Sequence, residues 1–218
     1  MQPFSGCGNS ICAIAKVHLM SAPSVSVRFY CVNKPMLTKL STITSNLRWP
    51  VVINAALFQL LWFACVLGSA HQLFVPALCA FLLLAAFQLR AHRRADGDYS
   101  LLVLSLALGI FIDSLWLSLG FVEFTDPRPL PFLAPAWILI LWAGFALTIN
   151  HSMAWVNAHP VLPAVLGAVG GPLSYLAGER LGAVAFLIDR PIVLAAIGLA
   201  WAFAMTVFAQ AAGRKLIG

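Results

Sequence analysis

About six long apolar segments between residues 50 and 212 constrain the fold of this chain more than any other feature. A helix needs about 20 mostly apolar residues to cross about 30 Å of hydrocarbon, where the backbone must satisfy its own polar groups. Strands of a barrel alternate apolar and polar residues, whereas these segments are continuously apolar. We therefore expect an all-α membrane bundle whose spans are Pro50–Gly68, Gln72–Leu89, Leu101–Val122, Phe132–Val156, a fifth beginning at Val161, and Pro191–Ala212.

The composition excludes a soluble domain. Of the 218 residues, 61% are hydrophobic and 9% are charged, whereas soluble domains average about 25% charged residues. The net charge of +6 does not indicate nucleic-acid binding, because the basic residues lie at the ends of apolar segments and not along one face. The predicted partner is therefore the lipid bilayer, together with a membrane-protein partner or a second copy of the chain.

The distribution of basic residues predicts the orientation. Loops on the cytoplasmic side of a membrane carry an excess of Lys and Arg, and short loops make successive helices antiparallel. With a cytoplasmic N-terminus, the outer loops hold only Arg128, Arg180 and Arg190, and the other ten basic residues lie inside. Six spans then return both termini to the cytoplasm, which predicts a multi-pass protein of a bacterial inner membrane.

Three regions follow along the chain. Residues 1–48 are rich in polar residues and contain no long apolar run, so we expect a flexible cytoplasmic tail or an over-called start codon, with Met20 and Met36 as alternative starts. Residues 49–213 form the six-helix transmembrane domain. Residues 214–218 form a short basic cytoplasmic tail.

The fifth span is rich in small residues, which let membrane helices approach closely. We expect a helix-packing face built from Gly167, Gly170, Gly171, Pro172, Ser174, Gly178 and Gly182. The alternative is a hinge at Gly170–Pro172, where proline would kink the helix and free a carbonyl group. The run from Gly182 to Ile188 is too short to span, and it is either re-entrant, interfacial or the end of an over-long helix.

Asp113 is an ionisable residue inside the apolar third span, where a charge costs roughly 2.5 to 3.5 kcal/mol on insertion scales. At 1.5 Å per residue it lies about 13 Å below the outer end of that span. Tyr175, Glu179 and Arg180 come from the outer half of the fifth span, so the four residues form one candidate cluster. Arg180 is the expected partner of Asp113. The alternatives are a structural ion pair, a protonated carboxyl bonded to Tyr175, or a proton relay or ligand site that also includes Ser174.

A second candidate cluster lies near the inner side. Asn150, His151 and Ser152 end the fourth span and Asn54 begins the first, so we expect hydrogen bonds between these two spans. His151 titrates near neutrality and is a candidate acid or base. It has no second His or carboxylate at helical spacing, and the cysteines lack zinc-site spacing. The sequence therefore predicts neither a metal nor a cofactor.

Three stretches resemble a family of small bacterial inner-membrane proteins with a domain of unknown function. They are WILILWAGFALTINHSMAW, GAVGGPLSYLAGERLG and the IDSLW around Asp113. The resemblance covers about residues 45–215. It implies a multi-pass protein of Gram-negative bacteria with a connection to lipid chemistry, and it carries no catalytic role to any residue.

Two classes of function remain open at this point. The first is a non-catalytic partner or assembly factor in envelope or lipid metabolism, favoured because no catalytic motif is present. The second is an intramembrane lipid-modifying enzyme or a small-molecule transporter that uses Asp113 with Arg180, or Asn150 with His151. The sequence leans toward the non-catalytic class.

Overall fold

The computed structural model describes residues 10–13, 30–33 and 49–213. The chain divides into two units, Met1–Trp49 and Pro50–Gly218. In the first unit, β1 (Ser10–Ala13) pairs antiparallel with β2 (Tyr30–Asn33). The rest of the predicted tail at 1–48 and the basic segment 214–218 lie outside the described residues, so both stay predictions.

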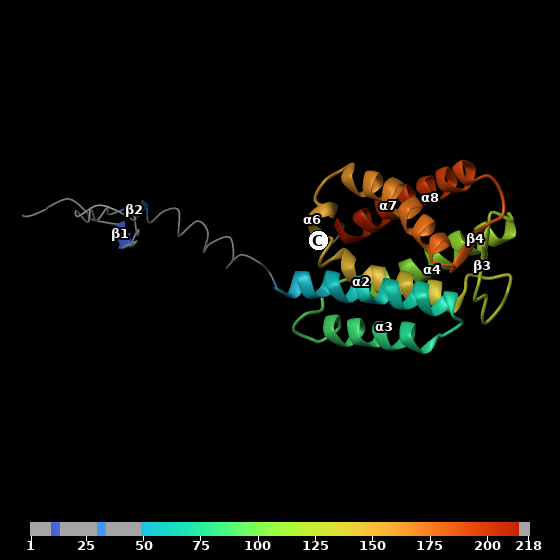
Figure 1. The fold of residues 1–218 in the computed structure, drawn as a ribbon, viewed down its shortest axis with the longest axis horizontal. Helices are drawn as coiled ribbons and strands as arrows, with labels where there is room; N and C mark the ends of the chain where they lie inside the picture. The colour runs from blue at the N-terminus through green and yellow to red at the C-terminus, as the bar shows by residue number, and fades with distance from the viewer. Residues whose placement is uncertain (1–9, 14–29, 34–48, 214–218) are drawn as a thin grey trace, which may run out of the picture. The chain divides into compact units, whose positions relative to one another are not determined.

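The second unit is a bundle of helices, which confirms the predicted all-α fold class. Successive long helices run in alternate directions (Figure 1), as the short loops between them predict. The elements are α2 (Trp49–Ala70), α3 (Val75–Gln88), α4 (Asp98–Ser118), α5 (Ala136–Ile149), the single turn α6 (Ala154–Asn157), α7 (Leu162–Arg180) and α8 (Arg190–Gly213).

The helices differ in their capacity to cross a membrane. Among the described residues, three are long and apolar enough by length and composition, namely Trp49–Ala70, Asp98–Ser118 and Arg190–Ala212. Helices α3 and α5 are apolar but have only 14 residues each, so the predicted spans Gln72–Leu89 and Phe132–Val156 were too long. Backbone breaks explain the shortening: Gln72 has a φ of 57°, and the extended Pro135 precedes α5. The span count of six stays a prediction.

Helix α5 forms the centre of the bundle. Nine of its fourteen residues are buried, which is the pattern of a helix enclosed on all sides. It packs against α3, α4 and α8, while α7 and α8 form the most extensive helix pair. The apolar core therefore lies along α5, and the other helices surround it.

Two helices end in the same way, and each is followed by one strand of a small β-ribbon. Gly120 and Gly182 have φ values of 66° and 82° and follow α4 and α7. In each case the glycine N–H and the next N–H donate to carbonyls in the last turn, which is the Schellman arrangement. Strand β3 (Val122–Phe124) then pairs antiparallel with β4 (Val184–Phe186).

This ribbon corrects two predictions. The third span ends at Ser118 and not at Val122, and the run from Gly182 to Ile188 contains a strand and no helix. Gly182 is a helix stop outside the packing face, because its left-handed backbone terminates α7. We call the end of the bundle that holds β3 and β4 the ribbon end.

The loop after β3 is fixed by a buried carboxylate. Asp126 is 4% exposed and its Oδ1 accepts from Arg128 Nε at 2.6 Å. Arg128 Nη2 also donates to the Gln72 carbonyl at 2.8 Å, which ties this loop to the turn between α2 and α3. Hydrogen bonding to Arg128 holds the pKa of Asp126 below its ordinary value.

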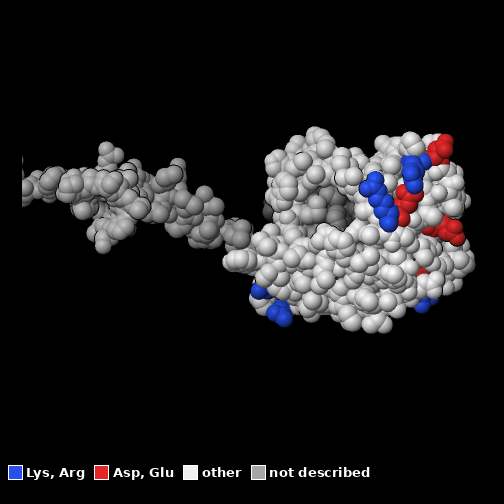
Figure 2. All heavy atoms as spheres, in the orientation of Figure 1, with Lys and Arg blue, Asp and Glu red and all other residues white. Residues whose placement is uncertain are grey.

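Charged side chains gather toward the two ends of the bundle on the face that Figure 2 shows, and the surface between them shows no Lys, Arg, Asp or Glu. The exposed apolar residues include Val103, Phe111 and Leu199, which are 70%, 68% and 75% exposed. Side chains of this kind suit contact with hydrocarbon. The second unit is therefore compatible with a membrane protein whose ends reach the polar layers.

Candidate functional site: a central cavity and a buried polar network

A cavity of about 440 Å³ lies inside the bundle. It opens between α2 and α7, where Figure 2 shows a hollow between the helices. Its walls are apolar and aromatic, and most ligand cavities fall in the range of about 300 to 1,000 Å³. The lining includes Phe58, Gln59 and Trp62 of α2, Trp137, Trp142 and Phe145 of α5, Gly170, Leu173, Ser174 and Tyr175 of α7, Trp201 of α8, and Phe124 and Val184 of the ribbon.

Asp113 lies behind this cavity and is fully buried. One of its carboxylate oxygens accepts a hydrogen bond from the Tyr175 hydroxyl, and the other accepts from Trp142 Nε1 at 2.6 Å. The three residues come from α4, α7 and α5, so the carboxylate joins three helices at depth. This satisfies the requirement that a buried polar group has hydrogen-bond partners.

The predicted partner of Asp113 was wrong. Arg180 is exposed, and Glu179 pairs with Arg190 at 3.0 Å, so neither reaches the carboxylate. Helical geometry explains the error, because five residues at about 100° each place Arg180 about 140° around α7 from Tyr175. The alternative of a carboxyl bonded to Tyr175 is confirmed as a contact, and Trp142 is a partner that sequence reasoning missed.

The glycines of α7 divide between two faces. A Cβ on Gly167 would collide with the backbone carbonyl of Trp201, and a Cβ on Gly171 with the ring of the same residue. These two glycines therefore allow α7 to approach α8 closely, as predicted. A Cβ on Gly170 meets nothing within 4 Å, so this residue faces the cavity and the packing role predicted for it was wrong.

Pro172, Gly178 and Ser174 each face a different neighbour. Pro172 packs toward Gly198, whose added Cβ would lie 3.3 Å from the proline ring and 3.0 Å from the Ala168 carbonyl oxygen. The carbonyl freed by Pro172 thus faces α8 and not the cavity. Gly178 faces Val184 of the ribbon at 3.4 Å. Ser174 faces α2, where it accepts from Trp62 Nε1 at 2.9 Å.

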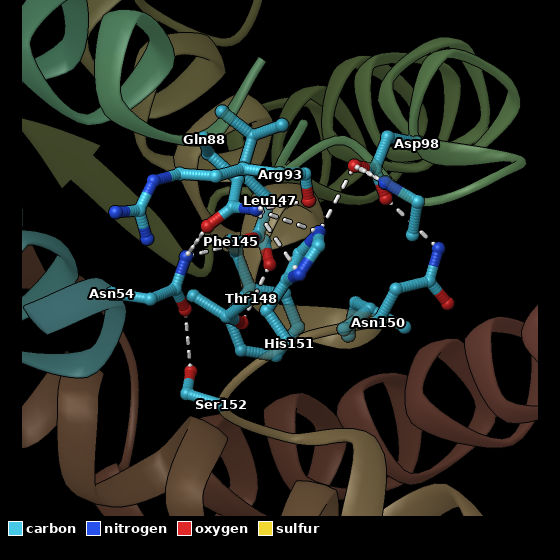
Figure 3. A network of polar contacts seen from close by, with 12 residues as sticks. Asn54, Gln88, Arg93, Asp98, Phe145, Leu147, Thr148, Asn150, His151 and Ser152 are labelled. Atoms are coloured by element: carbon cyan, nitrogen blue, oxygen red, sulfur yellow. Dashed lines mark hydrogen bonds and ion pairs between the residues drawn. The ribbon is translucent and has the colours of Figure 1, made fainter. Parts of the chain in front are cut away.

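A buried polar network lies at the end of the bundle opposite the ribbon, and we call it the inner network (Figure 3). Asp98 is fully buried at the first residue of α4. Its Oδ2 lies 2.9 Å from His151 Nε2, and its Oδ1 accepts from Asn150 Nδ2 at 2.9 Å. Gln88 Nε2 lies 3.1 Å from His151 Nδ1.

The network continues from Gln88 to α2. Asn54 Nδ2 donates to Gln88 Oε1 at 2.8 Å, and Ser152 Oγ donates to Asn54 Oδ1 at 2.7 Å. Gln88 Nε2 also lies 3.1 Å from His151 Nε2, so the amide group contacts both nitrogens of the imidazole ring. The chain links the ends of α2, α3, α4 and α5.

The predicted inner cluster of Asn54, Asn150, His151 and Ser152 is therefore brought together. Sequence reasoning missed Gln88 and Asp98, because it placed Gln88 inside a span and Asp98 in a solvated loop. The signal was available, since Gln88 is a polar residue at the end of an apolar helix and Asp98 begins one. Among the described residues, no three His, Cys, Asp or Glu side chains lie close enough to hold a metal ion.

Tyr175 provides a stability test of the Asp113 contact. We expect Tyr175→Phe to lower the free energy of unfolding by about 1–3 kcal/mol, because it leaves a buried carboxylate oxygen without its donor. The same change should cost close to nothing in an Asp113→Leu background, where the partner is already absent. Reversible unfolding in detergent measures both values, with the exposed Tyr99→Phe as control. Equal losses in the two backgrounds would contradict the contact.

The fold and the cavity define an all-α bundle whose apolar helices are compatible with a membrane protein. Family comparison places the chain more narrowly. A family model described as "Protein of unknown function (DUF2878)" matches residues 51–207, so the chain belongs to this family. That result confirms the predicted resemblance to a domain of unknown function. Comparison with curated proteins and with solved structures found no match.

Proposed function

We propose that this chain is a multi-pass protein of the bacterial inner membrane that binds an acyl chain in its central cavity. In this role it serves envelope or lipid metabolism as a non-catalytic partner. The observation that carries the proposal is the cavity itself, which is apolar, aromatic and open between α2 and α7. The exposed apolar residues Leu166 and Leu173 of α7 are among those that line it.

Charge supports the orientation in this proposal. Arg90, Arg93 and Arg94 lie between α3 and α4 at the end that holds the inner network. The positive-inside rule assigns such a loop to the cytoplasm. At the ribbon end, the basic residues alternate with acidic ones, as in the Asp126–Arg128 and Glu179–Arg190 pairs. The ribbon end is therefore proposed to face the periplasm.

Occupation of the cavity can be tested by filling its opening. The full chain in lipid nanodiscs is exposed to a phospholipid with a photoreactive group along one acyl chain, and covalent labelling is measured after illumination. We expect Gly170→Phe to reduce labelling severalfold, because the space beside this residue is open and a ring would enter it. Val103→Phe on the exposed side of α4 serves as the matched control. Equal labelling of the two variants would overturn the proposal.

The inner network favours a second candidate, an intramembrane enzyme or transporter that uses the His151–Asp98 pair. The observation behind it is a histidine held against a buried carboxylate at 2.9 Å, an arrangement that suits proton transfer. Complementation of a deletion strain separates the two candidates. A His151→Gln protein at normal abundance that fails to complement supports the chemical role, and one that complements supports the structural role.

A further inference from the structure

The cavity contains one hydrogen bond that crosses it from helix to helix. Trp62 Nε1 of α2 donates to Ser174 Oγ of α7 at 2.9 Å, and both side chains line the cavity and are partly buried. A molecule that fills the cavity would therefore contact this pair.

Ser174 lacks the donated hydrogen bond that several other hydroxyl residues of the described helices make. Ser118 and Thr206 each donate to a carbonyl one turn earlier in their own helix, at 2.8 Å, and Ser105 donates to the Trp142 carbonyl at 2.6 Å. Ser174 accepts a hydrogen bond, but within the described part of the chain its own hydrogen has no acceptor. A serine hydroxyl carries one donor and two acceptor sites. Its donor is therefore available to a molecule in the cavity.

The cavity wall carries no charged side chain among the described residues. An anionic head group placed there would remain unpaired in a region of low dielectric constant, which is costly. Asp113, behind the lining residues Tyr175 and Trp142, is itself acidic and has both oxygens occupied by them. The polar part of the ligand must therefore be neutral.

The one available donor further restricts that polar part. Trp62 N–H is already bonded to Ser174 Oγ, so the free donor of this pair is the Ser174 O–H, which suits an oxygen acceptor with no hydrogen of its own. A carbonyl oxygen meets this description and is a stronger acceptor than an ether oxygen. An alcohol brings an additional hydrogen that needs an acceptor, and an alkane leaves the Ser174 donor unpaired.

Resting on the proposed function, we propose that the cavity selects a neutral acyl ester, whose carbonyl oxygen accepts from the Ser174 hydroxyl. The hydrocarbon chain then lies along the aromatic wall formed by residues such as Phe58, Phe145 and Trp201. This assignment names the chemical class of the ligand. It also gives Ser174 the role of a specificity-determining residue, whose hydroxyl is positioned by the hydrogen bond from Trp62.

A competition experiment tests the assignment. The full chain in nanodiscs is labelled with the photoreactive phospholipid while methyl palmitate, octadecane or palmitate competes. We expect the ester to displace the label at about fivefold lower concentration than the alkane, because only the carbonyl gains the neutral hydrogen bond from Ser174. Palmitate, an anion at neutral pH, should compete less well than the ester.

Matched variants make the result specific. Ser174→Ala should remove the preference for the ester and Trp62→Phe should reduce it, while displacement by octadecane stays unchanged. Ser118→Ala, which removes a hydroxyl bonded within its own helix, should leave the preference intact. Equal displacement by ester and octadecane in the unmodified chain would overturn the ester assignment alone. Failure of every competitor, together with labelling that Gly170→Phe does not change, would overturn the proposed function as well.

Discussion

Asp98→Ala is expected to destabilise the protein by about 3–5 kcal/mol, the usual cost of removing one partner from a buried charged pair. The change leaves Asn150 Nδ2 and His151 Nε2 without an acceptor in a site where Asp98 itself is fully buried. It also removes the acceptor for the Ala95 N–H. Unfolding in detergent, followed by circular dichroism, measures the loss.

Two other substitutions test whether the loss of stability comes from the network contacts and not from the removal of a negative charge alone. Asp96→Ala removes a carboxylate from an exposed residue of the same loop, so we expect a change of less than about 0.5 kcal/mol. Asp98→Asn keeps the shape and one acceptor oxygen, and it should fall between the two. If Asp98→Ala and Asp96→Ala cost the same, the inner network does not stabilise the bundle.

Gly167→Ala is expected to lower stability by about 1–3 kcal/mol, the range for overpacking a close contact. The added Cβ would collide with the Trp201 carbonyl, and a backbone atom cannot move away as a flexible side chain can. The helices α7 and α8 would have to separate along their most extensive contact. Thermal unfolding in detergent, with the extracted protein monitored by size-exclusion chromatography, measures this effect.

Gly170→Ala supplies the control from the same helix. The space around Gly170 is open, so the methyl group meets nothing, and alanine is the better helix former. We expect unchanged or slightly higher stability. A loss at Gly170 equal to that at Gly167 would show that the two faces of α7 are not distinct.

The sequence predicted the class of fold because hydrophobicity along the chain is a strong and local signal. It could not predict the lengths of α3 and α5, which depend on backbone breaks at Gln72 and Pro135. The β-ribbon was also missed, although each strand follows a glycine that ends a helix. Gly120 and Gly182 carry the pattern, and Phe121 stacks on Trp116 as the apolar contact of such a helix end often does.

The sequence predicted how far along its helix each candidate residue lies, but not which face of the helix it occupies. Depth along a span correctly grouped His151 with Asn54, because both lie near the same end of the bundle. It wrongly grouped Arg180 with Asp113, since rise along a helix does not say which face a residue occupies. The Trp142 contact with Asp113 joins α5 to α4, and such pairings between helices depend on the tertiary arrangement.

The location of a bound chain tests the central claim most directly. After labelling with the photoreactive phospholipid, the attachment sites are mapped by peptide mass spectrometry. We predict attachment at cavity residues such as Phe58, Leu173 and Phe145, which line the space between α2, α5 and α7. Attachment confined to outward-facing residues such as Val103 and Leu199 would contradict the claim, because any helix in a bilayer acquires labels there.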